Sequence, residues 1–485
     1  MKTNNRIKEY KQAAKQIFDT IKVDYSEKRR AEGLPFIYKQ SHVYWCAGNV
    51  FDTVIDYMRM AREQKIDGTE MITAVEINSV LDYVLLNYKV AEYSYNGDIS
   101  SWYDDFAWWG IAAAKAGQKE YETVFGEPDG KYVKGFKAIA ASCWDIMKNG
   151  IPKTDKEVAG KTSTQPVSSA YTPNIWGAPN VWDKCAQHEF QYAKPRFPGG
   201  VWQADISMQK DERNNSYNPS DTLLGPFQDT VINGLFFYLG QELEPGSPLI
   251  SGLFKFIKQW CFDKEVNEEG NSWLYPTPTG DINDDKDTTS AAIILERVRT
   301  YARNENNVYP RVYSPDWGDE YVSWCGDQGL LLGGMVKYLE ANPGDSDAKA
   351  IIAHILKGTT KYMKNESNGI ISPWYPTAYS NPLYDAAQES YYSGIGVFMR
   401  YLLFAYRNTY VQEMLNNENS GKPLINEIPE TPQLSALLYI SANACLNGAK
   451  EFPVYNSNSM HESLFYQFNK LSTLVTAIHV LSATK

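Results

Sequence analysis

Apolar residues recur at helical spacing along most of this chain. Near the N-terminus they stand three or four positions apart, which places them on one face of a helix: Ile7, Tyr10, Ala14, Ile17, Phe18 and Ile21. Similar patterns begin near His42, Thr69, Ser100, Lys131, Phe227, Pro248, Thr288, Trp324, Ser346, Ala387, Thr431 and Met460. The strict alternation typical of strands is scarce. The pattern therefore predicts an all-α protein of about twelve helices.

Turn residues separate these helical segments. Asn342, Pro343 and Gly344 are expected to end one helix, and Asp345 or Ser346 to cap the next. Helices at this spacing, with no visible sequence repeat, favour one ring of helical hairpins over two domains. We therefore expect a single domain over residues 1–485, with long loops near 149–182, 203–226 and 267–287.

The composition favours a neutral sugar ligand over a charged one. The chain contains 34 Tyr, 19 Phe and 13 Trp, and such rings can stack on sugar faces, although most are expected to pack in the interior. A net charge of −11 disfavours nucleic acid and polyanionic glycans, because both are bound by clustered Lys and Arg.

Metal and membrane signals are weak. The six cysteines form no C-x-x-C pair and the five histidines form no H-x-x-x-H pair, so buried free thiols are expected. The acidic stretch Asp281–Asp287 lacks the glycine and terminal glutamate of an EF-hand, which favours a solvated turn over a calcium site. We expect neither a metal nor a cofactor. No apolar run is long enough for a membrane span, and the polar N-terminus does not resemble a signal peptide.

The sharpest local feature is a pair of adjacent carboxylates, Asp104 and Asp105, among large aromatic rings in residues 100–110. Two neighbouring like charges raise each other's proton affinity, which can leave one group ionised and the other protonated. Neighbouring Cα atoms lie about 3.8 Å apart, so the carboxyl groups could approach the separation of about 5 Å typical of retaining glycosidases. The alternative is that both acids only interact with the N-terminus of a helix capped by Ser100 or Ser101.

The segment Trp102–Trp109 resembles the W-Y-D-D-x-x-W-W hallmark of glycoside hydrolase family 76, which comprises endo-α-1,6-mannanases with an (α/α)6 barrel. The resemblance assigns Asp104 the role of nucleophile and Asp105 that of acid/base. It extends from Tyr44 to Asp52, through Gly199–Trp202 (the family's G-G-I-W turn), to Gly394–Leu402. Trp324–Gly334 resembles the family's N-Q-G helix start, with an aspartate in place of the expected asparagine.

These matches define candidate substrate-binding residues: Trp45, Asn49, Asp52, Trp102, Tyr103, Trp202, Asn233, Asp327 and Gln328. Asp52 could equally bond a neighbouring helix end. The three tryptophans could pack in the core, and the amides of Asn233 and Gln328 could hold helices together. Trp108 and Trp109 are expected in the cleft wall and the core.

The sequence thus predicts an (α/α)6 barrel that cleaves α-1,6-mannan, or a related neutral α-mannoside polysaccharide, internally and with retention. We expect a monomer located outside the cytoplasm, as the family resemblance implies. Three rival hypotheses remain: a non-catalytic glycan-binding protein, another helical-barrel hydrolase or lyase, and an inactive relative. A lyase acting on uronates would need a basic cluster beside the acid pair, and none is visible in the sequence.

Overall fold

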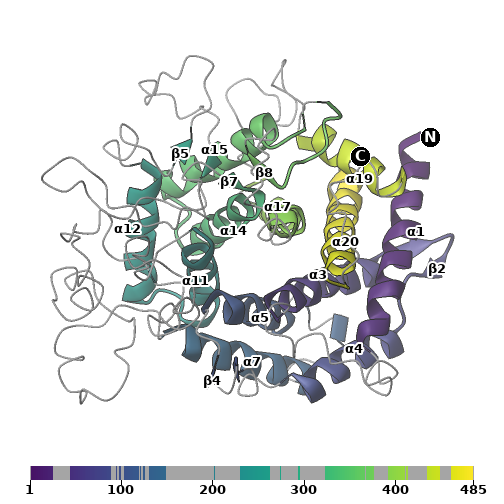
Figure 1. Cartoon of the computed structure of the whole chain (residues 1–485), viewed down its shortest axis with the longest axis horizontal. Helices are drawn as coiled ribbons and strands as arrows, with labels where there is room; N and C mark the ends of the chain where they lie inside the picture. The colour runs from purple at the N-terminus through teal and green to yellow at the C-terminus, as the bar shows by residue number, and fades with distance from the viewer. Residues whose placement is uncertain are drawn as a thin grey trace, which may run out of the picture.

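The computed structural model of this chain is an all-α barrel. It describes residues 2–25, 44–88, 94–95, 98–99, 103–118, 121, 124–125, 130–148, 201, 230–262, 273–274, 293–294, 323–365, 367–375, 391–409, 411–412, 434–447 and 460–483. Within this part of the chain, twelve α-helices alternate between an outer and an inner layer (Figure 1). The predicted fold class, an (α/α)6 barrel, is confirmed.

Six helices form the inner ring: α3 (Tyr44–Glu63), α5 (Tyr103–Ala116), α11 (Thr230–Leu243), α14 (Cys325–Ala341), α17 (Gly394–Arg407) and α20 (Met460–Ala483). Each packs against the next in this order, and α20 packs back against α3 to close the ring. Inner helices are covered on every side, so α3, α5, α11 and α17 are buried around most of their circumference.

The other six helices surround this ring: α1 (Lys2–Lys22), α4 (Ala74–Asn87), α7 (Lys131–Met147), α12 (Pro248–Phe262), α15 (Ser346–Tyr362) and α19 (Leu434–Asn447). These helices bury one stripe only. In α1, Tyr10, Ala14 and Phe18 are fully buried, as the sequence pattern predicts. Because outer and inner helices alternate along the chain, neighbouring inner helices run in the same direction. Their N-termini therefore gather at one end of the barrel.

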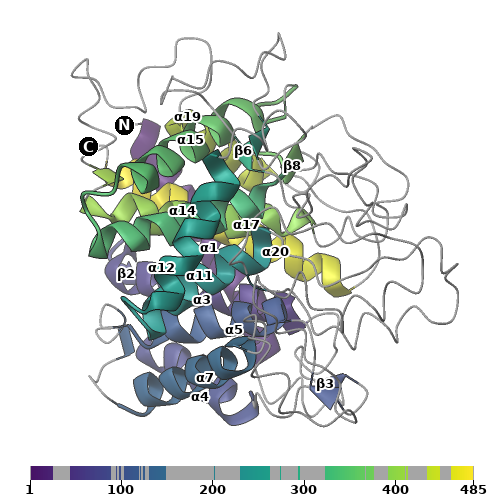
Figure 2. The same ribbon diagram turned by 90° about the vertical axis from the view of Figure 1, so that its left-hand side faces the viewer.

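Short strands, each of two residues, lie between the helices in antiparallel pairs: β1 (Lys65–Ile66) with β2 (Thr69–Glu70), β3 (Ser94–Tyr95) with β4 (Asp98–Ile99), β5 (Trp273–Leu274) with β6 (Ile293–Ile294), and β7 (Ser323–Trp324) with β8 (Trp374–Tyr375). A 3₁₀ turn, η1 (Val23–Tyr25), follows α1. In the view of Figure 2, β3 and β8 lie towards the same side of the molecule, and they precede the inner helices α5 and α17.

One predicted helix is wrong. The helix expected from Thr288 would include Ile293 and Ile294, but these two residues form β6 and pair with β5. The local apolar run fits both conformations. The strand is selected by Gln328, whose side-chain amide bonds both the N–H and the C=O of Ile294.

Helix ends follow the predicted punctuation. The backbone N–H of Asn342 closes α14 on the carbonyl of Tyr338, and the Asp345 carboxylate accepts from the N–H groups of Asp347 and Ala348 at the start of α15. The three predicted long loops, and the expected caps Ser100 and Ser101, lie outside the described residues. None of the described helices is both long and apolar enough to cross a bilayer.

Candidate active site

The acid pair lies in the first turn of α5, at the end of the barrel where the inner helices begin. Asp104 and Asp105 are both half-buried, between the buried rings of Tyr103 and Phe106. The N-terminus of a helix carries partial positive charge and stabilises carboxylates in its first turn. Both predicted catalytic residues therefore lie on a helix of the inner ring, where the helix N-terminus favours ionisation and burial opposes it.

Electrostatics separate the two acids. Burial, and then the negative charge of Asp104, raise the pKa of Asp105 well above its usual value. A carboxyl group with a raised pKa retains its proton at a pH where an ordinary aspartate is ionised. Asp105 is therefore suited to donate a proton, the role that the family resemblance assigns to it.

An indole ring lies one helical turn below the pair. Trp108 follows Asp104 by four residues and Asp105 by three, so it shares their side of α5. Its ring is 3% exposed, and its centroid lies 6.4 Å from that of Trp45 and 6.4 Å from that of Trp324. We call these three rings, from α3, α5 and the start of α14, the aromatic layer. Trp45 is half-buried within it.

Trp109 faces away from this layer. Its indole N–H donates to the carbonyl of Tyr44 at 2.8 Å, and its ring stacks on Tyr88 with centroids 4.2 Å apart. Trp109 is fully buried and anchors α5 against α3. Consecutive tryptophans thus have different functions, one beneath the acid pair and one in the core.

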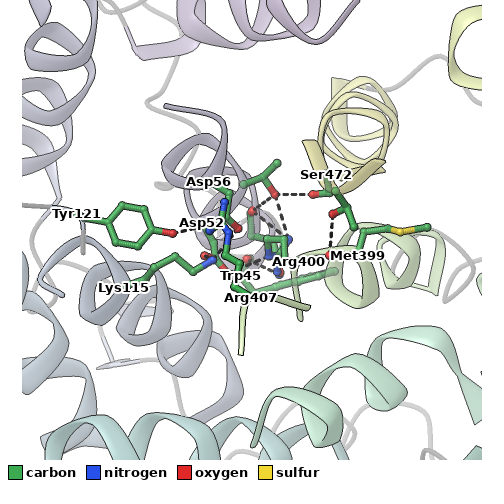
Figure 3. A network of polar contacts seen from close by, with 12 residues as sticks. Trp45, Asp52, Asp56, Lys115, Tyr121, Met399, Arg400, Arg407 and Ser472 are labelled. Carbon is green, nitrogen blue, oxygen red and sulfur yellow. Dashed lines mark hydrogen bonds and ion pairs between the residues drawn. The ribbon is translucent and has the colours of Figure 1, made fainter. Parts of the chain in front are cut away.

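Two of the predicted substrate-binding residues, Asp52 (Figure 3) and Asn49, are buried on α3 inside the barrel. Asp52 is 2% exposed, and its carboxylate pairs with Lys115 and, at 2.9 Å, with Nε of Arg400. Asn49 is fully buried; it accepts from Arg400 and donates to the carbonyl of Trp45 at 3.2 Å. A substrate contact does not fit either buried side chain. The Asp52 carboxylate pairs with cations of α5 and α17, and the Asn49 amide bonds α17 and its own helix. For Asp52, the observed contacts agree with the alternative considered from the sequence, a bond to a neighbouring helix.

The same ion network continues towards the other end of the barrel. Asp56 pairs with Lys115 at 2.9 Å and accepts from the Tyr121 hydroxyl at 2.7 Å. Burial alone would raise the pKa of Asp56, but the positive charges of Lys115 and Arg407 outweigh it and lower the pKa. Asp52 and Asp56 are therefore structural anions that join α3 to α5 and α17.

Two of the predicted substrate-binding side chains are amides that bond backbone segments instead of facing solvent. Asn233 accepts from the N–H of Val201 at 2.9 Å and donates to its C=O at 3.5 Å. Gln328 bonds Ile294 in the same two-way manner, at 2.9 and 2.7 Å. Both amides are buried, at 2% and 0% exposure. Both amides are structural, as the alternative to sugar binding expected, but each holds a non-helical segment to a helix instead of joining two helices.

Residues 9–157, which include the acid pair, match the model of glycosyl hydrolase family 76. The predicted resemblance to family 76 is confirmed.

Solved structures similar to this chain include the Lin0763 protein from Listeria innocua, at 12% identity and a TM-score of 0.48, covering 99% of this chain and 98% of that one. Dfg5 from Chaetomium thermophilum, in complex with glucosamine, has 12% identity and a TM-score of 0.47, covering 90% and 80%. An inactive variant of the α-1,6-mannanase GH76A of Salegentibacter sp. HEL1_6, in complex with α-1,6-mannotriose, has 10% identity and a TM-score of 0.45, covering 96% and 99%. A search of curated proteins found no match.

Asp327, the aspartate that stands where the family 76 motif is expected to have an asparagine, is buried. Asp327 lies in the first turn of α14 and is 0% exposed, so its position does not fit the predicted direct substrate contact. Tyr103 is 3% exposed and packs at the start of α5. Trp102 and Trp202, the other predicted sugar platforms, lie outside the described residues.

Sequence reasoning missed the cations that pair with Asp52. Lys115 and Arg400 are 8% and 2% exposed. Each is the one charged residue in a long apolar stretch of its helix, 106–116 in α5 and 394–406 in α17. That isolation is a usable signal, because a buried charge requires a partner. Cys46, Cys143, Cys325 and Cys445 are buried free thiols, as predicted. Among the described residues, no three or more His, Cys, Asp and Glu side chains are grouped to bind a metal.

Proposed function

We propose that this protein is a retaining, endo-acting glycoside hydrolase of neutral α-mannoside polysaccharides, with linear α-1,6-mannan as its substrate. The acid pair carries the proposal: Asp104 and Asp105 stand in the first turn of an inner helix, and the pKa of Asp105 is raised. The family 76 match over residues 9–157 supports a carbohydrate substrate.

In the first step, the ionised carboxylate of Asp104 attacks the anomeric carbon of the bound mannose. The bond from that carbon to the glycosidic oxygen breaks, and Asp105 gives its proton to the departing oxygen. The product is an ester between Asp104 and the sugar, with Asp105 ionised. In the second step, Asp105 removes a proton from water, the hydroxyl attacks the anomeric carbon, and Asp104 departs as a carboxylate. Two inversions leave the configuration retained.

The surroundings of the pair suit these roles. The N-terminus of α5 stabilises the negative charge on Asp104 before attack. Burial keeps Asp105 protonated until the leaving group needs a proton. The carboxylates supply this chemistry without a cofactor.

The first prediction concerns the two carboxylates themselves. We expect Asp104→Asn and Asp105→Asn each to lower hydrolysis of linear α-1,6-mannan by about 10²–10⁴-fold, because each removes the nucleophile or the proton donor. Asp82→Asn, which removes a carboxylate paired with Lys131 at the surface, should leave the rate unchanged. Release of reducing ends measures the rate, and NMR of the first product should show the α-anomer.

Three results would contradict the proposal. A first product with β configuration would exclude retention. Wild-type protein that binds mannan without releasing reducing ends would support a glycan-binding protein instead. Turnover of uronate-containing oligosaccharides in preference to neutral ones would support a lyase or uronyl hydrolase.

We also propose that the protein acts as a monomer outside the cytoplasm, where cell-wall and extracellular polysaccharides occur. This location rests on the family 76 match. Detection of the native protein in extracytoplasmic fractions of its source cells would test it.

A further inference from the structure

Trp324 lies at a junction between the acid-bearing helix and the segment that precedes α17. It is 5% exposed and forms the N-cap position of α14. The edge of its ring meets Trp108 at 89°, and on another side it meets Tyr391 at 89° with centroids 6.5 Å apart. Its indole N–H donates to the carbonyl of Tyr391 at 2.8 Å. One side chain thus contacts the residue beneath the acid pair and the start of another inner helix.

The two glycines around this indole leave room for it. A Cβ at Gly326 would collide with the six-membered ring of Trp324, and a Cβ at Gly394 would collide with its Nε1. Gly326 lies in the first turn of α14 and Gly394 begins α17, so the two helices approach each other closely around the ring.

The residues 391–393, which we call the rim segment, are held from both sides. Asn469 of α20 donates to the carbonyl of Tyr392 and accepts from the N–H of Gly396, both at 2.6 Å. Trp324 holds the preceding carbonyl, that of Tyr391. The rings of Tyr391 and Tyr392 are only half-buried, and Tyr392 packs against the half-buried Trp374 at 5.1 Å. The rim segment is therefore fixed at two consecutive backbone carbonyls, while its two tyrosine rings stay partly exposed.

We propose that Trp324 is a positioning residue, which fixes Trp108 beneath the acid pair and holds the rim segment 391–393 as a sugar-binding surface of the same site. The inference rests on the proposed function for its substrate, a neutral glycan. Aromatic faces held in place by backbone bonds bind sugar rings with little loss of conformational freedom. The ring of Trp324 and its N–H group therefore have separate effects, one on catalysis and one on binding.

The second prediction separates these two effects by substitution. Trp324→Phe keeps an aromatic ring against Trp108 but removes the bond to Tyr391, so we expect KM for α-1,6-mannan to rise about three- to tenfold while kcat changes less than about twofold. Trp324→Leu also removes the ring, and kcat should then fall about tenfold or more. A merely structural role would not produce this split.

Trp144 provides a matched control on α7. It is 3% exposed, and its indole N–H donates to Glu244 at 2.8 Å, a bond of the same length. Trp144→Phe should leave both kcat and KM within about twofold of wild type. If Trp324→Phe and Trp144→Phe have the same kinetic constants, the proposal is wrong.

A second pair of variants covers the case in which Trp324→Leu does not fold. Gly394→Ala pushes the indole of Trp324 aside and should raise KM, whereas Gly240→Ala crowds Ile250 and Trp144 away from the site and should not. Equal kinetic effects of Gly394→Ala and Gly240→Ala would overturn the inference.

Hydrogen–deuterium exchange tests the positioning without substrate. Trp324→Phe should speed exchange of the amides of Gly396 and Val397, and Trp144→Phe should not. If wild type hydrolyses no mannan but Trp324→Phe still speeds this exchange, the proposed substrate is wrong and the positioning role stands. Unchanged exchange in Trp324→Phe would overturn the positioning role, whatever the activity.

Discussion

The proton on Asp105 links the candidate chemistry to stability. Because burial and Asp104 raise its pKa in the folded protein, folding favours the protonated form. A carboxyl group with a raised folded-state pKa stabilises the fold only below its unfolded pKa, which is about 4. This advantage is lost as pH rises from there to the folded-state pKa. At neutral pH the Asp105 carboxyl therefore contributes less to the stability of the barrel than it does at acid pH.

The third prediction follows from that sign. Asp105→Asn resembles the protonated acid at every pH. At pH 7 the variant should therefore melt at a higher temperature than wild type, because its free energy of unfolding is larger by on the order of 1 kcal/mol. The difference should shrink towards zero as pH falls to about 4. Melting curves of both proteins between pH 4 and pH 8 measure it. A gap that does not depend on pH would show that the mutation acts by packing.

At the scale of elements, the inner helices are joined by buried polar contacts as well as by apolar packing. Lys115 of α5 pairs with Asp52 and Asp56 of α3, and Arg400 of α17 pairs with Asp52 (Figure 3). Gln241 of α11 donates to the carbonyl of Gly334 in α14 at 3.0 Å. These contacts set which helix faces which, because a mismatched neighbour would leave a buried charge or amide without its partner.

The fourth prediction concerns this ion network. Lys115→Met keeps a long side chain but leaves Asp52 and Asp56 with less compensating charge, so we expect a loss of about 3–5 kcal/mol in the free energy of unfolding. Lys131→Met, which breaks an exposed pair with Asp82, should cost less than about 1 kcal/mol. Urea unfolding of the two variants compares these costs. Equal losses would mean that the buried ion network contributes no more to the stability of the fold than an exposed ion pair does.

At the scale of the whole molecule, the closed ring makes the first and last inner helices neighbours. α3 and α20 pack together although they are far apart in the sequence, and the hydroxyls of Thr53 and Ser472 are bonded at 3.0 Å. Arg400 of α17 also bonds Thr53, at 3.1 Å. Removing one helix from such a ring would expose both of its neighbours.

The fifth prediction is that the chain unfolds as one unit, as expected for a single domain over residues 1–485. Urea unfolding curves followed by far-UV circular dichroism and by tryptophan fluorescence should coincide, because no part of the ring buries its surface alone. A population in which residues 44–147 exchange their amide hydrogens quickly while residues 391–483 stay protected would reveal two independent units instead.

The sequence alone determined the features that depend on local spacing. Helical periodicity placed the helix starts, for example those of α7 and α12, because neighbours three or four residues apart decide which face of a helix is buried. The acid pair and its place in a first turn also followed from adjacent residues. The family resemblance added the roles proposed for Asp104 and Asp105 and the expectation of an (α/α)6 barrel.

Only the tertiary structure decided which polar residues face the site and which join helices. Asp52, Asn49, Asn233 and Gln328 resemble binding residues in the sequence, yet their partners lie on other elements: Arg400 and Lys115, or the backbone of Val201 and Ile294. The same distant contact with Gln328 made a strand of Ile293 and Ile294, where the local pattern predicts a helix. Periodicity reports which side of an element is covered, but the partner that covers it is set by the closure of the ring.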